Sequence, residues 1–235
     1  MISERLYSLL LCAAVILPGA SAAQLTEGFD NITTLPGSGW AIVNNSVAAG
    51  STSWFQGTPA LTAQSGAANS YIAANFNAAA FGGNISLWLI TPLLTLDNGV
   101  ALSFYTASTQ GAPDNLEVRF STNGASANVG ANATSVGDFT NLLLAINPSL
   151  TGAGYPSSFT LETATISGLA GPVTGRFAFR YDVPDTSTNG DFIGLDTVSV
   201  SSAASATPEP ATLSLGLLGL AFLLPLAARR KHHSQ

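Results

Sequence analysis

The stretch Phe177-Ala178-Phe179-Arg180-Tyr181-Asp182 places an aromatic ring at every second position and Ala, Arg and Asp between the rings. Successive side chains of a β-strand point to opposite faces, so this pattern indicates one buried face and one wet face. Residues 102–105 and 116–121 alternate in the same way. The stretch therefore predicts a half-buried strand in an all-β domain.

Outward from this stretch, short apolar runs alternate with turn residues. Turns are expected at 35–37, 97–99, 112–114, 122–124 and 189–190, where Gly, Pro, Asn and Asp cluster. Further strands are predicted at residues 25–29, 40–43, 53–56, 71–76, 87–91, 139–146, 159–166 and 192–200. Residues 125–137 look like a loose surface loop. About ten short strands with this spacing predict an antiparallel β-sandwich.

The N-terminus has the features of a signal peptide. Arg5 precedes an apolar run at 9–17, and Ala20-Ser21-Ala22 supplies the small residues that signal peptidase accepts. A buried N-terminal helix is the alternative. We expect residues 1–22 to be removed, and Cys12, the only cysteine, to be lost with them.

The C-terminus has the features of a membrane anchor. After a small-residue linker at 201–207, Pro208-Glu209-Pro210 leads into an uncharged run at 211–228, and Arg229, Arg230 and Lys231 follow. Such a run spans about 27 Å as a helix, enough for a bilayer core. The cations would remain on the cytoplasmic side. A single transmembrane helix is therefore predicted.

The charged residues between these ends exclude several classes of function. Residues 24–206 contain three arginines and eleven acids, a balance of −8, and no Lys, His or Cys. Phosphates would be repelled, so nucleic-acid binding is not expected. Catalytic triads, Schiff-base lysines and His-ligated zinc lack their residues. A carboxylate pair remains arithmetically possible, but no spacing singles one out, so we expect no enzyme.

The tail resembles the PEP-CTERM sorting signal: the Pro-Glu-Pro motif, the apolar run and the basic cluster occur in this order at 208–231, with Pro225 as a departure inside the run. The resemblance implies an exported, membrane-inserted precursor. Signal peptidase and an exosortase-type processing enzyme would be its partners, and the cell surface or extracellular matrix its destination. A permanent tail anchor is the alternative.

The body, residues 24–200, resembles the choice-of-anchor J family and, more distantly, the MAM and cleaved-adhesin jelly rolls. The segments that carry the resemblance are Gly28-Phe29-Asp30, Gly39-Trp40, Trp54-Phe55, Trp88-Leu89-Ile90-Thr91-Pro92, Leu102-Ser103-Phe104-Tyr105, Asn115-Leu116-Glu117-Val118, Phe177-Ala178-Phe179-Arg180-Tyr181 and Gly190-Asp191-Phe192-Ile193-Gly194-Leu195-Asp196. The resemblance implies a jelly-roll β-sandwich with an extracellular role and no enzyme activity.

The same resemblance implies a structural cation between the first and last strands. Asp30 and Asp196 are the matching positions, with Glu27 and Asp191 nearby. Four carboxylates and backbone carbonyls would supply the six to eight oxygens that Ca²⁺ takes. Asp196 shares a phase with the apolar Val198, so an inward face would bury it. A solvated or Arg-paired aspartate, or one turned outward by a β-bulge near 194–195, is the alternative.

Two aromatic residues, Trp54 and Tyr105, are candidates for an exposed ligand contact, although a Trp in a sandwich is more often core. The sequence as a whole predicts an exported, non-catalytic surface or matrix protein that serves adhesion or associates with exopolysaccharide. The alternative is a lectin-like module with a specific glycan site.

Overall fold

The structure is a computed structural model that describes residues 23–202. The predicted signal peptide, transmembrane helix, sorting motif and basic cluster lie outside the described residues. Within residues 23–202, no helix is long and apolar enough to cross a membrane.

Strands make up nearly all of the regular structure in this region. In chain order the elements are β1 (Ala23–Glu27), η1 (Ile32–Thr34), η2 (Pro36–Ser38), β2 (Ala41–Asn44), β3 (Val47–Ala49), β4 (Phe55–Gln56), β5 (Ile72–Asn75), η3 (Phe76–Ala78), β6 (Ala79–Ile90), β7 (Leu94–Leu96), β8 (Ala101–Ser108), β9 (Leu116–Ser121), β10 (Asn141–Ile146), β11 (Thr160–Thr165), β12 (Val173–Val183) and β13 (Phe192–Ser201).

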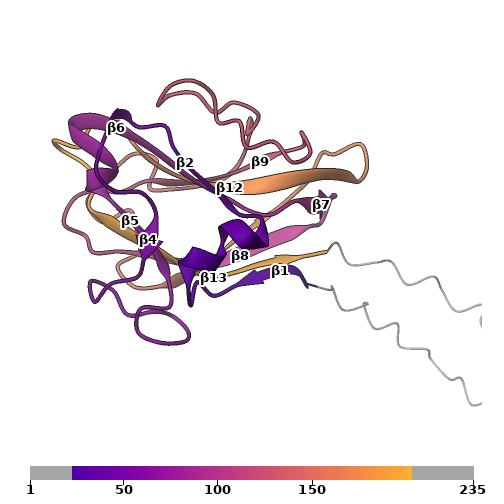
Figure 1. Cartoon of the computed structure of the whole chain (residues 1–235), viewed down its shortest axis with the longest axis horizontal. Coiled ribbons are helices and arrows are strands. Elements are labelled where there is room, and N and C mark those ends of the chain that lie inside the picture. The colour runs from indigo at the N-terminus through magenta and orange to yellow at the C-terminus, as the bar shows by residue number, and fades with distance from the viewer. Residues whose placement is uncertain (1–22, 203–235) are drawn as a thin grey trace, which may run out of the picture. The chain divides into compact units, whose positions relative to one another are not determined.

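The strands form two antiparallel sheets that pack face to face (Figure 1). The six-stranded sheet has the order β11-β8-β13-β5-β4, with β1 paired to β13. The seven-stranded sheet has the order β10-β9-β12-β6-β2, with β3 paired to β6 and β7 to β12. The predicted fold class, an all-β antiparallel jelly-roll sandwich, is confirmed.

The alternating stretch at 177–182 forms the middle of the seven-stranded sheet. Phe177, Phe179 and Tyr181 on β12 are fully buried in the core between the sheets. The ring of Phe179 meets that of Phe104 on β8 of the other sheet edge-on, with 5.0 Å between centroids. Burial of large rings from both sheets provides the main apolar driving force for the fold.

Two parts of the sandwich differ from the sequence prediction. Strand β6 begins at Ala79, eight residues before the predicted strand, because its first half consists of small residues without a clear apolar alternation. The short strands β3 and β7 were not predicted at all. They are three residues long, too short for a period-two pattern to show.

The segment 125–137 is not the loose loop that its composition suggested. It lies against the outer face of the seven-stranded sheet, where Val129 and Ala133 are buried. Val129 joins Phe139 in a small apolar cluster over Trp88, whose ring lies 5.7 Å from that of Phe139. This loop therefore forms a second, smaller core outside the sheet.

The two ends of the described chain lie next to each other. Ala23 at the start of β1 pairs with Ser201 at the end of β13 (Figure 1). The connections to both flanking segments therefore leave from one edge of the sandwich.

Candidate functional site

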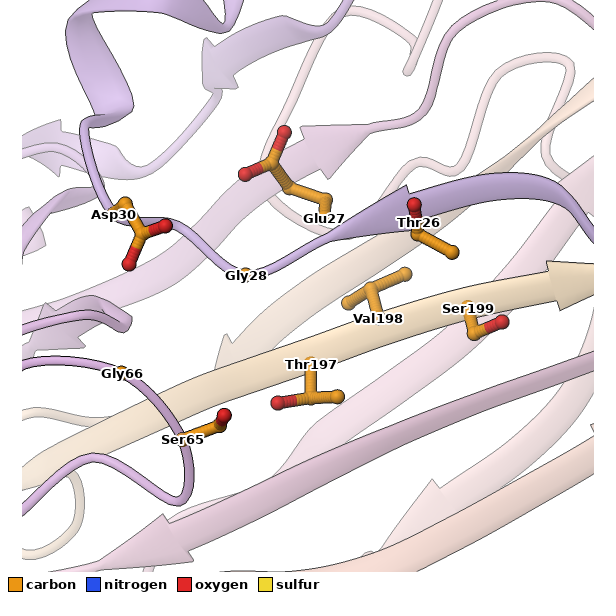
Figure 2. A pocket seen from close by; sticks show the side chains of 9 residues that line it. All are labelled: Thr26, Glu27, Gly28, Asp30, Ser65, Gly66, Thr197, Val198 and Ser199. Carbon is orange, nitrogen blue, oxygen red and sulfur yellow. The ribbon is translucent and has the colours of Figure 1, made fainter.

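A pocket of about 250 Å³ lies where β1 ends beside β13. Figure 2 shows its three walls, which are the end of β1, the loop at Ser65 and Gly66, and the irregular part of β13 from Thr197 to Ser199. Glu27 and Asp30, two of the predicted ion ligands, line it together. Two of the four residues that the sequence analysis grouped therefore lie in one pocket, and their role as ion ligands stays a prediction.

Local geometry fixes the turn that carries these acids. Glu27 Oε1 accepts a hydrogen bond from the Phe29 N–H at 2.8 Å. Phe29 has a left-handed φ of 54° and is fully buried against Trp40, with ring centroids 5.7 Å apart. The buried ring thus holds an otherwise unfavourable backbone conformation, and Asp30 follows it into solvent.

Asp196 is buried, but not on the inward face that its phase with Val198 suggested, and it does not pair with an arginine. Its Oδ2 accepts from the backbone N–H groups of Gln64 at 2.7 Å and Ser65 at 3.1 Å. Its Oδ1 accepts from the Thr197 hydroxyl at 3.1 Å. Burial raises the pKa of Asp196, and these hydrogen bonds oppose that rise. The carboxylate is therefore an anchor for the loop that covers it.

A β-bulge explains the direction of the Asp196 side chain. The register between β13 and β8 shifts between Asp196 and Ser199, where β13 contains one extra residue. Leu195 and Val198 both face the core across this shift, so Asp196 points out of the sheet. The predicted bulge exists, but it follows Asp196, whereas the sequence placed it at 194–195.

The four predicted ion ligands do not form one cluster. Asp191 accepts hydrogen bonds from the Thr109 hydroxyl and, at 2.7 Å, from the Gly111 N–H, and it does not line the β1–β13 pocket. Across residues 23–202, no three Asp, Glu, His or Cys side chains gather as metal ligands. Since amide N–H groups occupy Asp196 Oδ2, the donors that fit a cation in the pocket are Glu27 and Asp30.

Of the two aromatic candidates, only Tyr105 is partly exposed. Trp54 is 4% exposed and belongs to the core cluster, so the expectation of an exposed Trp54 ring is wrong. Its neighbour Phe55, on β4, is the half-buried member of the pair. Tyr105 is half-buried on β8, opposite Asp196 and Leu161.

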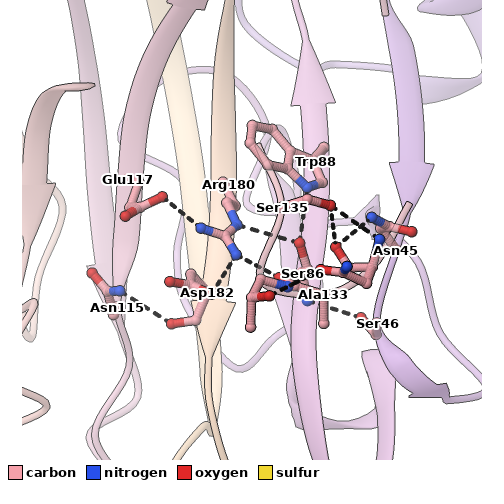
Figure 3. A network of polar contacts seen from close by, with 12 residues as sticks. Asn45, Ser46, Ser86, Trp88, Asn115, Glu117, Ala133, Ser135, Arg180 and Asp182 are labelled. Carbon is pink, nitrogen blue, oxygen red and sulfur yellow. Dashed lines mark hydrogen bonds and ion pairs between the residues drawn. The ribbon is translucent and has the colours of Figure 1, made fainter. Parts of the chain in front are cut away.

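The outer face of the seven-stranded sheet carries a buried ion-pair network that the sequence analysis did not identify (Figure 3). Arg180 on β12 lies 2.9 Å from Glu117 on β9 and 3.0 Å from Asp182. It also donates to the carbonyl of Ala133 at 2.6 Å and contacts the Trp88 ring face, 5.3 Å from its centroid. The guanidinium thus ties the sheet to the 125–137 loop.

The two acids of this network differ in pKa. Burial tends to raise the pKa of Glu117, but hydrogen bonds from Arg119 and the charge of Arg180 lower it below its usual value. For Asp182, burial outweighs the contact with Arg180, the nearby Glu117 charge adds to the effect, and the pKa rises to about 6.

One signal in the sequence pointed to this network. Glu117 and Arg180 occupy polar positions of two alternating strands, in a domain with only three arginines. Pairing them requires the register of β9 and β12, in which Arg180 stands opposite Glu117. That register depends on contacts distant in sequence, so alternation alone does not reveal it.

Among the solved structures that resemble this domain are cleaved adhesin domains of Lys-gingipain from Porphyromonas gingivalis. The K2 domain aligns with a TM-score of 0.52 and 21% identity over 76% of this chain and 99% of its own. The K3 domain aligns with a TM-score of 0.50 and 21% identity over 77% of this chain and 100% of its own. The domain is thus a β-sandwich of the cleaved-adhesin kind, and identity at this level establishes the fold alone.

The C-terminal segment is matched independently. Residues 206–231 match the PEP-CTERM protein-sorting motif. No curated protein matches the chain. The chain therefore carries a PEP-CTERM sorting signal behind an adhesin-like sandwich. The motif indicates export, sorting to the surface and processing by an exosortase.

Proposed function

We propose that this chain is an exported, non-catalytic surface protein that serves adhesion by associating with exopolysaccharide. The observation that carries the proposal is the order of its parts: an adhesin-like sandwich followed by the sorting motif at 206–231.

The surface chemistry of the domain supports a neutral polymer as its partner. All three arginines of residues 23–202 are engaged inside the fold: Arg119 and Arg180 pair with Glu117, and Arg176 donates to the carbonyls of Gly39 and Thr91. The polar side chains that remain on the described surface are carboxylates, amides and hydroxyls. Such a surface repels polyanions and hydrogen-bonds readily with sugar hydroxyls.

The sorting step would act at the Pro208-Glu209-Pro210 motif. Arg229, Arg230 and Lys231 would hold the precursor in the membrane until an exosortase-type enzyme acts. Replacing Glu209 by Ala should then leave a full-length, membrane-held precursor in a host that has this enzyme. Equal processing of the variant and the wild type would contradict this step.

A calcium ion at the β1–β13 pocket is a separate proposal. Glu27 and Asp30 supply two carboxylates, and backbone carbonyls and water would have to supply the other oxygens that Ca²⁺ takes. A site with so few charged ligands suits weak, exchangeable binding.

Affinity electrophoresis tests the main proposal. The full-length protein, solubilised in a detergent without a sugar headgroup, is run through gels with and without the host's exopolysaccharide, and through gels with heparin as a polyanionic control. We expect retardation by the exopolysaccharide and none by heparin. Equal mobility in gels with and without the exopolysaccharide would overturn the proposal.

A further inference from the structure

A second pocket, of about 260 Å³, lies beside the Arg180 network on the outer face of the seven-stranded sheet. Its floor is formed by Asn115, Arg180 and Asp182, and Asn84 of β6 and Thr134 of the covering loop stand at its rim. Strands β6 and β12, the residue before β9 and several loops therefore meet around one small polar cavity.

Asn115 contributes a hydrogen-bond acceptor without a donor. Its Nδ2 donates to the carbonyl of Asp182 at 3.1 Å. Since that carbonyl can only accept, the orientation of the amide is fixed and Oδ1 points the other way. The residue is 6% exposed, and no donor among the described residues reaches Oδ1. Burying such an oxygen without a partner costs about 1–3 kcal/mol, so a donor from a ligand would be favourable here.

Asp182 has spare acceptor capacity as well. Its Oδ1 pairs with Arg180, while its Oδ2 has no partner within residues 23–202, and the side chain is 27% exposed. Arg180 is already engaged by Ser86, Glu117, Ala133 and Asp182. The floor of the pocket therefore mainly offers acceptors, and the guanidinium has little left to donate.

The charges around the pocket balance. Glu117 and Asp182 face Arg119 and Arg180, two negative groups against two positive ones. A cationic ligand would meet Arg180, and an anionic ligand would meet Asp182. The other walls include Pro148, Leu150 and Pro184, which give apolar surface for C–H groups. A ligand that fits is neutral, small, rich in hydroxyl donors and apolar on one face.

We propose that this pocket binds one neutral monosaccharide unit of a polysaccharide, whose hydroxyls donate to Asn115 Oδ1 and Asp182 Oδ2 while its C–H face contacts Pro148 and Leu150. The proposal deepens the proposed association with exopolysaccharide and rests on it. It assigns the contact to the seven-stranded sheet, on the opposite layer from Tyr105.

Saturation-transfer NMR on the full-length protein, in a detergent without a sugar headgroup, tests the site. The probes are the methyl glycosides of glucose, galactose and mannose, with glucosamine as a cationic analogue and glucuronate as an anionic one. We expect at least one neutral glycoside to bind, and both charged sugars to bind more weakly than that glycoside. Binding of none of the glycosides, or stronger binding of a charged sugar, would overturn the proposal.

Variants locate the binding. Asp182→Asn keeps the side-chain shape and replaces part of its acceptor capacity by a donor. The Kd for the neutral glycoside that binds should therefore rise at least about tenfold. The matched control is Asp185→Asn, because Asp185 bonds to Ser187 and does not line the pocket; its Kd should equal that of the wild type. Asn84→Ala changes a half-buried rim residue, so it is informative even if Asp182→Asn does not fold. An unchanged Kd in a folded Asp182→Asn, or in Asn84→Ala if the former does not fold, would overturn the site.

The same variants separate this proposal from the proposed function. If the wild type and Asp182→Asn are retarded equally by the exopolysaccharide, the protein binds the polymer elsewhere, and only the pocket proposal fails. If the wild type is not retarded at all, the proposed association itself fails.

Discussion

Asp196 and Asp182 lie on the outer faces of the two sheets. Their carboxylates differ in the number and kind of partners that they have. Asp196 lies under the loop at 64–65 and accepts from two backbone N–H groups and a hydroxyl. Asp182 has a charged partner, Arg180, but its Oδ2 is unbonded within the described chain, and it lines the same pocket as Asn115, whose Oδ1 has no donor there.

The difference separates an acid that completes the fold from one that is available to a ligand. Neutral N–H donors leave Asp196 no capacity for a further partner, so its role is to fasten a loop. A single arginine shared with Glu117 leaves Asp182 incompletely bonded. A raised pKa is common to both acids, so the pKa alone would not distinguish them. The number of donors to each carboxylate does distinguish them.

Removing Arg180, the cation that pairs with Asp182, should lower the stability of the domain the most. Arg180→Met leaves two partly buried carboxylates side by side, and loss of one partner from a buried ion pair costs about 3–5 kcal/mol. We expect the free energy of unfolding, measured by tryptophan fluorescence in denaturant, to fall by about that amount. Arg119→Met, which removes a more exposed partner of the same Glu117, should cost about 1 kcal/mol. Equal losses in the two variants would contradict the central role of Arg180.

Removing Asp196, on the outer face of the other sheet, should lower the stability somewhat less. Asp196→Ala removes the acceptor of the Gln64 and Ser65 N–H groups. We expect a loss of about 1–2 kcal/mol, because both residues lie on an exposed loop where water can replace the lost acceptor. Hydrogen exchange at these two amides should accelerate more than exchange in β12. Asp185→Ala, at an acid outside both sites, serves as the control and should change stability by about 0.5 kcal/mol or less.

A pH dependence should distinguish Asp182 from its neighbours. Its pKa is about 6 in the folded protein and about 3.9 in an unfolded chain. Between these values the folded state keeps a proton that the unfolded state has released, so stability falls as pH rises from about 4 to about 6. We expect this group to contribute about 1–2 kcal/mol of that fall, less than the shift in pKa alone would give, because the side chain is 27% exposed and solvent screens it. Comparing Asp182→Asn with the wild type at pH 4 and pH 7 isolates the contribution. An identical pH slope in both proteins would contradict the raised pKa.

Removal of calcium should have the smallest effect on stability. Since Glu27 and Asp30 are the carboxylates of the β1–β13 pocket, we expect EDTA to lower the melting temperature by less than about 2 °C, well below the shift that about 1 kcal/mol causes in a domain of this size. Glu27→Gln should abolish even this shift. A large drop on EDTA that calcium reverses would indicate a tighter site than these ligands explain.

The sequence determined the sandwich far better than it determined the sites. The alternation at 177–182 identified β12 because rings at every second position require a buried face. Glu27 and Asp30 were grouped together and do line one pocket, because both adjoin the end of β1; their role as ion ligands stays a prediction. For Asp196 the sequence left three alternatives open: burial on an inward face, a solvated or Arg-paired carboxylate, and a β-bulge. It did not predict the actual partners, the backbone N–H groups of residues 64 and 65, which have no signature in the sequence. The pairing of Glu117 with Arg180, and the burial of Trp88 under the 125–137 loop, likewise depend on register and loop path.

The pairing of Ala23 with Ser201 would have a mechanical consequence if the C-terminal segment tethered the domain to a surface. A pull on the tail acts along β13, which is hydrogen-bonded to β1, β5 and β8. When the load is applied at the opposite end of the sandwich, these bonds are sheared together instead of being opened one at a time. Strand β13, which leads to the C-terminal segment, is therefore among the best supported in its sheet, and a load applied there would meet three hydrogen-bonded neighbours.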